Sequence, residues 1–231
     1  FFAVSCLGVL MLQKDLGTAL MYYGTTLMLF YASSGSVLLT GLGLVGGGGA
    51  AVLGYKIFAH VKKRVAIWLN PWSDYDNAGY QIVQGLMALA SGGLIGCGLG
   101  LGSPKTIPVY HTDFIFAVIC EQFGLIFGLC VLAMYVAIIW RGATTAMAAR
   151  RSFHGLLAMG CTVLIALQTF TIIGGVIKLV PLTGVTMPFV SYGGTSLVSS
   201  LCLVGLLQGV GSLNNDDLDE DTELAMMGDG E

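Results

Sequence analysis

Long apolar stretches without charged residues occupy most of the chain, a pattern typical of helices that cross a membrane. A spanning helix needs about 20 mostly apolar residues, and its backbone groups must pair internally because lipid offers no hydrogen-bond partners. Residues 16–55 contain no charge and are long enough for two spans joined by a turn at Ser33-Ser34-Gly35-Ser36. After a remnant of an earlier helix at Phe1–Leu12, the pattern predicts six whole spans at 16–34, 36–58, 79–101, 114–140, 154–177 and 187–210.

These spans predict an all-α fold, a polytopic bundle of integral membrane helices. We expect the membrane domain to occupy residues 1–212. The remaining residues, 213–231, hold eight of the chain's 13 acidic residues and no aromatic residue, which is typical of a disordered tail. Because Phe1 lies inside an apolar run, we also expect the chain to be a fragment that lacks the first spans of a longer protein.

Glycine is concentrated near the end of the third predicted span, within residues 92–102. Two interpretations remain open. Small residues allow neighbouring helices to pack closely, or the helix loosens toward the outer face, which is tolerated only where the backbone lines a cavity or is buried in protein. The spacing Gly96-x-Gly98-x-Gly100 resembles a dinucleotide-binding loop, but no strand precedes it, so we reject that interpretation.

The distribution of Lys and Arg predicts how the bundle is oriented, because short cytoplasmic loops are enriched in positive charge. Lys62-Lys63-Arg64 follows the second predicted span, and Arg141, Arg150 and Arg151 lie between the fourth and the fifth. Alternating passes put both clusters on one side, so we expect that side and the C-terminus to be cytoplasmic. The loops that then face outward are 33–36, 102–113 and 178–187.

Composition supports a membrane protein and excludes several other classes. Hydrophobic residues make up 55% of the chain and charged residues 10%, with a mean hydropathy of +0.83. A soluble domain has roughly a quarter of its residues charged, so a soluble enzyme and a nucleic-acid-binding protein are both excluded. The six cysteines match no zinc-site spacing and lie in apolar stretches, where we interpret them as packing residues.

Ionisable residues close to a membrane interior are candidates for function because they are costly to place there. Asp113 begins the fourth predicted span beside His111. It could cap the helix, or act as a general base or a metal- or phosphate-facing carboxylate at the water–lipid boundary. Glu121 follows eight residues later, about 12 Å deeper in a regular helix. It is either a polar contact between helices or a group that faces water.

Two basic residues, Lys105 and Lys178, fall on the side expected to face outward. They could extend to lipid headgroups or bind an anionic group such as a pyrophosphate. From the residues alone, the chain is a transporter or an enzyme that acts on a lipid-linked substrate. Its outward polar site comprises His111, Asp113, Lys105 and Lys178.

Five motifs, in a fixed order along residues 1–212, resemble those of one known family. They are QKDLGTA at 13–19, GYQ…SGGL…GLG at 79–100, HTDFIFA at 111–117, PLTG at 181–184 and PFVSYGGTS at 188–196. These motifs are similar to those of the FtsW/RodA/SpoVE family, the SEDS proteins of bacterial cell-wall synthesis. Three departures stand out: Lys14 replaces a Pro, Gln122 replaces a second Glu after Glu121, and Ile172 replaces an Asn found in many members.

The resemblance implies a peptidoglycan glycosyltransferase that polymerises lipid II at the outer face of the bacterial cytoplasmic membrane. It implies a class B penicillin-binding protein as transpeptidase partner, and no nucleic acid. The family's essential acid falls on Asp113, and the SYGG motif suggests substrate contacts at Ser191 and Tyr192. No cofactor is certain, although a divalent cation could share the binding of the pyrophosphate. The further candidates for substrate binding are Lys178, Lys105, His111 and Glu121.

Two other functions remain open from the sequence. A flippase that moves lipid II across the bilayer would also need many helices, an acid within the membrane and a polar cavity. A non-catalytic scaffold for the division or elongation machinery is the third possibility. The sequence does not distinguish division from elongation or sporulation.

Overall fold

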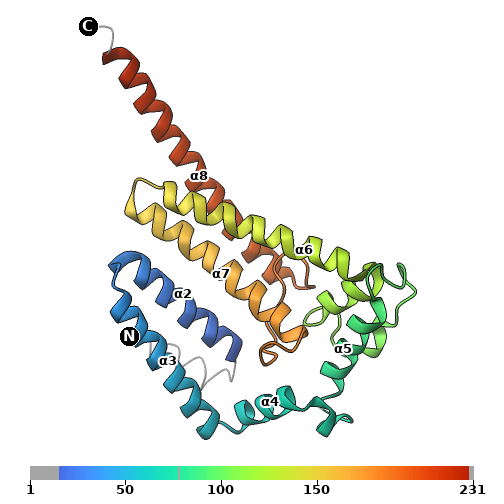
Figure 1. Ribbon diagram of the computed structural model, residues 1–231. Coiled ribbons are helices and arrows are strands. Elements are labelled where there is room, and N and C mark those ends of the chain that lie inside the picture. Colours follow the sequence, from blue (N-terminus) through green and yellow to red (C-terminus); the bar gives the residue numbers. More distant parts are fainter. Residues whose placement is uncertain (1–15, 78, 229–231) are drawn as a thin grey trace.

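Helices are the only regular secondary structure in the described part of the chain. The structure is a computed structural model that describes residues 16–77 and 79–228, with the backbone alone at residue 16 and over 216–228. No strand occurs in these ranges, and the predicted all-α fold is confirmed. Predictions for Phe1–Leu12 and Lys14 lie outside the described residues. The elements are α2 (Leu16–Ser34), α3 (Val37–Ile57), α4 (Ala59–Leu69), η1 (Pro71–Asp74), α5 (Tyr80–Gly92), η2 (Pro104–Thr106), α6 (Ile115–Ala148), α7 (Ser152–Val176) and α8 (Gly194–Gly228) (Figure 1).

Four of the described helices are long and apolar enough to cross a membrane, which makes the chain a multi-pass membrane protein. They are Val37–Ile57, Ile115–Ala148, Ser152–Val176 and Gly194–Asn215. The helix α2 forms where it was predicted but is not among these four, and its 19 residues include three Tyr and three Thr. The prediction of six whole spans is therefore corrected to four within the described residues.

The predicted span at 79–101 is wrong because its helix is too short. The helix α5 has 13 residues, about 20 Å at 1.5 Å per residue, whereas the hydrocarbon core of a bilayer is about 30 Å thick. After α5 the chain forms the glycine loop, residues 93–102, in which four glycines have positive φ angles. Left-handed backbone of this kind favours glycine, and it confirms the interpretation in which the helix loosens.

The glycine loop fits into a break in α6. Gly124 has φ 85° and ψ 170°, values that no helix contains. The hydrogen bonds between the loop and the two sides of the break are Cys97 N–Glu121 O (2.9 Å), Gly98 N–Gln122 O (3.0 Å), Leu125 N–Gly93 O (3.0 Å) and Ile126 N–Leu94 O (3.3 Å). They pair backbone groups that the break releases from the helix, as burial requires. We call these four bonds the loop clasp.

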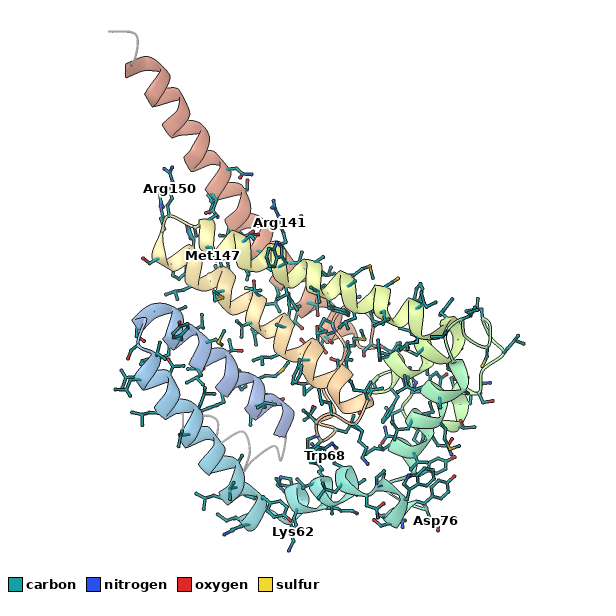
Figure 2. All side chains as sticks on the ribbon, in the orientation of Figure 1. Lys62, Trp68, Asp76, Arg141, Met147 and Arg150 are labelled. Atoms are coloured by element: carbon teal, nitrogen blue, oxygen red, sulfur yellow. The ribbon has the colours of Figure 1, made fainter. Side chains whose placement is uncertain are left out.

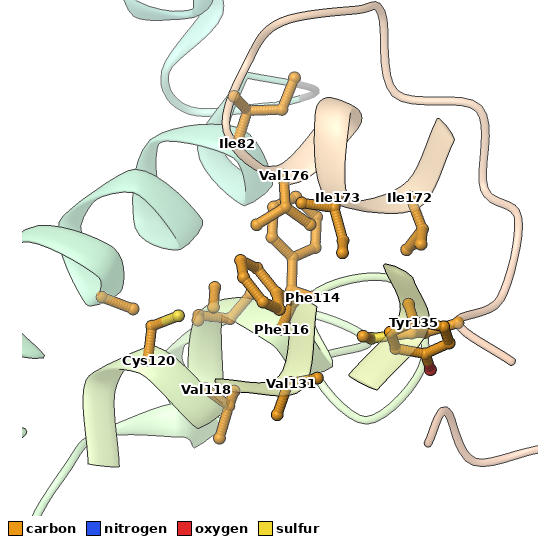
Figure 3. Close-up of a cluster of buried hydrophobic side chains, with 14 residues drawn as sticks. Ile82, Phe114, Phe116, Val118, Cys120, Val131, Tyr135, Ile172, Ile173 and Val176 are labelled. Atoms are coloured by element: carbon orange, nitrogen blue, oxygen red, sulfur yellow. The ribbon is translucent and has the colours of Figure 1, made fainter. Parts of the chain in front are cut away.

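A cluster of buried apolar side chains lies between α5, α6 and α7 and fixes the start of α6 (Figure 3). Phe114 is fully buried in it, with Ile82 of α5 and Val176 of α7 in the same cluster. Gly85 makes room for the Phe114 ring, since a Cβ at that position would overlap it. Because Phe114 is anchored in this way, the backbone of the preceding residue, Asp113, is held at the end of the bundle.

The two basic clusters lie at opposite ends of the bundle, which corrects the predicted topology (Figure 2). Trp68 Nε1 donates to Lys178 O (3.0 Å), so α4 with Lys62 lies at the C-terminal end of α7. Arg141 and Arg150 lie at the other end. The prediction failed because α5 does not cross the membrane, so one pass rather than two separates the clusters.

The loop at 33–36 also lies at the end opposite to the one predicted. Along α2, a Cβ at Gly17 would lie 2.5 Å from Val185 Cγ2, and one at Gly160 of α7 would lie 3.5 Å from Leu29. These contacts show that α2 and α7 run antiparallel, with residues 33–36 near the start of α7 (Figure 1). The loops at 102–113 and 178–187 share one end of the bundle, as expected, and 33–36 does not join them.

The last helix differs from the prediction at both ends. The helix α8 begins at Gly194 rather than near 187, because the segment 177–193 between α7 and α8 is irregular. Its backbone stays helical to Gly228, well beyond residue 210, and extends past the other helices (Figure 1). Extending an existing helix is easier than starting one, and the acidic segment contains the helix formers Leu, Glu, Ala and Met. The domain boundary at residue 212 stays a prediction.

Candidate active site

Asp113 lies in the turn that leads into α6 and is partly buried. The cap position of α6 is Phe114, and the helix has no side-chain cap hydrogen bond, so Asp113 does not serve as the helix cap. Burial raises the pKa of Asp113 above its ordinary value of 3.8. A hydrogen bond with the Thr112 side chain and the positive charge of Arg64 both act in the opposite direction. The carboxylate is therefore free of a capping task and has a raised proton affinity.

The irregular segment 177–193 faces Asp113 through a glycine. A Cβ built on Gly184 would lie 3.9 Å from Asp113 Oδ2, and Gly184 has a φ of 77°, so a side chain there would be strained. The carbonyl of the preceding residue, Thr183, accepts a hydrogen bond of 3.3 Å from Arg64 Nη1. The acid on one segment and the guanidinium on another thus meet at Thr183 and Gly184.

Ser191 ties the two loops of the site together. Its Oγ donates to Thr112 O (2.6 Å) and accepts from Met187 N (2.8 Å), and the side chain is buried. The single hydroxyl proton is therefore already used. This geometry gives Ser191 a supporting task next to Asp113, where the motif had suggested a substrate contact.

His111 and Tyr192 form an exposed edge of the same site. Tyr192 N donates to His111 O (2.9 Å), and the two rings pack edge to face with centroids 5.7 Å apart. Both side chains are exposed. The structure thus brings His111, Asp113, Ser191 and Tyr192 together, as the motifs predicted, and leaves two rings available to a ligand.

Lys178 lies at the neighbouring junction between α7 and α4. Its Nζ donates to Leu69 O (3.3 Å), the last carbonyl of α4, and its own carbonyl accepts from Trp68 Nε1 (3.0 Å). The ammonium group has three N–H donors, so further donors remain for a ligand. Lys178 therefore holds α4 in place. The sequence had suggested only a contact with lipid headgroups or the binding of an anionic group.

Lys105 and Glu121 lie apart from Asp113 in their contacts. Lys105 is exposed on η2 and makes no hydrogen bond or ion pair among the described residues. Glu121 is buried under the glycine loop, where Oε1 accepts from Ser103 N (3.0 Å) and Oε2 has no partner in the described part of the chain. Glu121 is thus a contact within the protein, one of the two interpretations left open.

Backbone strain is concentrated in the loops around the site. Three non-glycine residues have φ between 56° and 64°: Val109, Lys178 and Phe189. Each such conformation costs about 1–3 kcal/mol and persists only where the surroundings impose it.

Within the described residues, no group of three or more His, Cys, Asp or Glu side chains could hold a metal ion.

Comparison with known proteins shows the family of this chain. Residues 1–215 match a family of cell cycle proteins named after FtsW, RodA and SpoVE. The chain belongs to the FtsW/RodA/SpoVE family. Its similarity to the peptidoglycan glycosyltransferase RodA of Mycobacterium tuberculosis is 43% identity over 204 residues, covering 88% of this chain and 44% of that protein. It is 40% identical to stage V sporulation protein E of Bacillus subtilis over 206 residues, 87% of this chain and 56% of that protein.

Two solved structures of the FtsW/RodA/SpoVE type share its fold. One chain belongs to a peptidoglycan synthase complex that coordinates polymerization and crosslinking; it has a TM-score of 0.72 and 27% identity, over 93% of this chain and 61% of that one. The other is an Asp-to-Ala mutant of Thermus thermophilus RodA, with a TM-score of 0.57 and 25% identity, over 89% of this chain and 52% of that one. The chain spans about half the length of the curated relatives that it matches.

Arg64 was not among the predicted site residues of this family member, because the expected topology put it on the opposite side of the membrane from Asp113. A signal for its position is present in the sequence. The segment Ala59–Leu69 has only 11 residues, contains three consecutive basic residues and contains Trp68. A short amphipathic helix with Lys, Arg and Trp is typical of a helix that lies in the membrane interface. The end of the bundle that carries Asp113 is expected at this interface.

Proposed function

We propose that the protein polymerises lipid II as a peptidoglycan glycosyltransferase, with Asp113 as its general base. Relatives with up to 43% identity carry the name peptidoglycan glycosyltransferase. The observation that carries the proposal is the partly buried Asp113 carboxylate, which faces Gly184 at the end of the bundle. In the reaction, the 4-hydroxyl of a GlcNAc attacks C1 of a MurNAc, its proton passes to Asp113, and undecaprenyl pyrophosphate leaves.

The chemistry of Asp113 suits this role. A hydroxyl group is a weak nucleophile at neutral pH, and a positioned base typically accelerates such a step by about 10²–10⁴-fold. Burial raises the pKa of Asp113, which makes the carboxylate a stronger base. Thr112 and Arg64 both lower the pKa of Asp113 and so limit this rise.

We further propose that the Asp113 end faces outward and that the C-terminus is cytoplasmic, because peptidoglycan is assembled outside the cytoplasmic membrane. Arg141 in the last two turns of α6, and Arg150 and Arg151 in the short connection to α7, then lie on the cytoplasmic side, in agreement with the positive-inside rule. The basic residues of α4 then lie on the outer side, against that rule, where the contacts of α4 with Thr183 and Lys178 hold them. A class B penicillin-binding protein is the proposed partner. One chain of a solved peptidoglycan synthase complex that coordinates polymerization and crosslinking has the fold of this chain, which supports the proposal.

A lipid II flippase is the alternative, and one observation favours it. The helix α6 is broken at Gly124, and broken helices are typical of transporters. A flippase needs both faces of the membrane to open in turn, whereas a polymerase needs only the outer one. Purified protein in detergent has no membrane sides, so the formation of glycan strands there requires an enzyme.

The test is therefore polymerisation of labelled lipid II by the purified full-length protein with its partner present. Asp113→Asn keeps the shape of the side chain and removes the base, so strand formation should fall by at least 10²-fold. Asp76→Asn is the matched control, since Asp76 is exposed on the turn before α5 and its loss should leave the rate unchanged. Normal strand formation by correctly inserted Asp113→Asn protein would rule out the assignment of Asp113 and favour a scaffold or another base.

A further inference from the structure

Arg64 has the position and the free donors of an anion-binding residue. We propose that Arg64 binds the pyrophosphate of the lipid-linked substrate and stabilises it as it leaves. The inference rests on the proposed function and adds to it a residue that neither the motifs nor the predicted topology indicated. In chemical terms, the C1–O bond to the pyrophosphate breaks and its electron pair stays on the phosphate oxygen. The new bond joins O4 to C1, and the hydroxyl proton passes to Asp113.

The placement of Arg64 comes from three hydrogen bonds and one close approach at the end of the bundle. Arg64 Nη1 donates to Thr183 O (3.3 Å), and Gly184, the next residue, lies against Asp113. The hydrogen bonds of Trp68 and Lys178 hold the C-terminal end of α4 against α7. Arg64 is thus fixed beside the acid from a helix that the sequence had put on the far side of the membrane.

The guanidinium group retains most of its binding capacity. Arginine has five N–H donors, and the described residues supply only the Thr183 carbonyl as an acceptor. No acid of the described part lies within ion-pair distance of Arg64, so the charge is not neutralised by the protein. Planar N–H pairs bind phosphate oxygens in a bidentate manner, which suits a pyrophosphate placed between Arg64 and Asp113.

The neighbouring cations are less suited to this task. Lys178 Nζ donates to Leu69 O on α4, not beside Asp113, and Lys105 makes no hydrogen bond or ion pair among the described residues. Lys62 and Lys63 are exposed on α4, and Figure 2 shows Lys62 directed away from the bundle. A cation that stabilises a leaving group must lie where its negative charge develops, and among these residues Arg64 lies beside Asp113.

Inorganic pyrophosphate is a suitable probe, because it competes for the leaving-group position without requiring turnover. The full-length protein, with its partner, would be assayed in detergent as wild type, Arg64→Gln, Arg64→Lys and Lys63→Gln. We expect Arg64→Gln to raise the inhibition constant for pyrophosphate and the KM for lipid II by about tenfold or more, as the loss of a charge-assisted bond predicts. Lys63→Gln removes the same charge from the adjacent exposed position and should behave as wild type.

The outcomes separate binding from a structural role. If Arg64 only supports Thr183, Arg64→Gln lowers kcat without changing inhibition by pyrophosphate, and the inference is overturned. If Arg64→Gln does not fold, Arg64→Lys decides: binding predicts inhibition several-fold weaker than in wild type, and unchanged inhibition overturns the inference. Failure of the proposed function is a different result: the wild-type protein forms no glycan strands, or Asp113→Asn forms them normally and Asp113 is not the base.

Discussion

Two opposing influences act on the Asp113 carboxylate, and their balance determines the pH range in which it can accept a proton. Burial raises its pKa, and the hydrogen bond with Thr112 and the charge of Arg64 both lower it. A general base must be deprotonated before the reaction, so kcat/KM should fall as pH falls through this pKa. Removing the Arg64 charge takes away a lowering influence, and the pKa of Asp113 then rises further.

We therefore expect Arg64→Gln to shift the acid limb of the kcat/KM–pH profile to higher pH. Arg64→Lys keeps a positive charge and should leave the limb near its wild-type position. The profile is measured for lipid II polymerisation at substrate concentrations below KM, where it reports groups of the free enzyme. A limb that stays in place or moves to lower pH in Arg64→Gln would show that Arg64 does not act on the base.

Among the elements, the glycine loop and the broken helix α6 stabilise each other through the loop clasp. Substitutions at two loop positions distinguish two effects on stability, that of the contact between the loop and α6 and that of backbone strain. Gly96 and Gly100 have φ angles of 91° and 78°. A Cβ at Gly96 would overlap Gln122 O across the clasp, whereas a Cβ at Gly100 meets nothing within 4 Å.

Gly96→Ala should thus destabilise the protein more than Gly100→Ala does. Both variants carry the strain of a left-handed alanine, roughly 1–2 kcal/mol, and only Gly96→Ala must also displace the α6 backbone. Melting temperatures of the two purified variants in the same detergent test this difference. Equal melting temperatures would mean that the loop and the break in α6 are not energetically coupled.

At the scale of the whole molecule, the sequence predicted the apolar helices and the motif residues. It did not predict that α4 lies at the same end of the bundle as Asp113. The spans that form α3, α6 and α7 were recognised because length and hydropathy suffice for them. Residues 79–101 are also free of charge, yet positive-φ glycines follow α5, which ends after 13 residues. That single error changed the parity of the passes and separated Arg64 from Asp113. Their proximity depends on tertiary contacts over more than 100 residues, such as Arg64 with Thr183.

The arrangement of the ends can be tested by labelling single cysteines with an impermeant reagent, in a protein that lacks its six native cysteines. The positions are Lys62→Cys on α4, Met147→Cys on α6 and Ser34→Cys at the turn after α2, all exposed. In intact cells we expect Lys62→Cys to label, and Met147→Cys and Ser34→Cys to label only after permeabilisation. The topology expected from sequence instead places positions 62 and 147 on one side and 34 on the other.

These three positions also distinguish the fold from its orientation. Labelling of positions 62 and 147 from the same side would contradict the fold, because α6 is the one pass between them in the described chain (Figure 2). Labelling from opposite sides, with 147 outside, would leave the fold intact and reverse the orientation. In that case Asp113 and Arg64 would face the cytoplasm, where no glycan strand is assembled, and the proposed polymerase activity would have to be abandoned even though the residues of the site remain together.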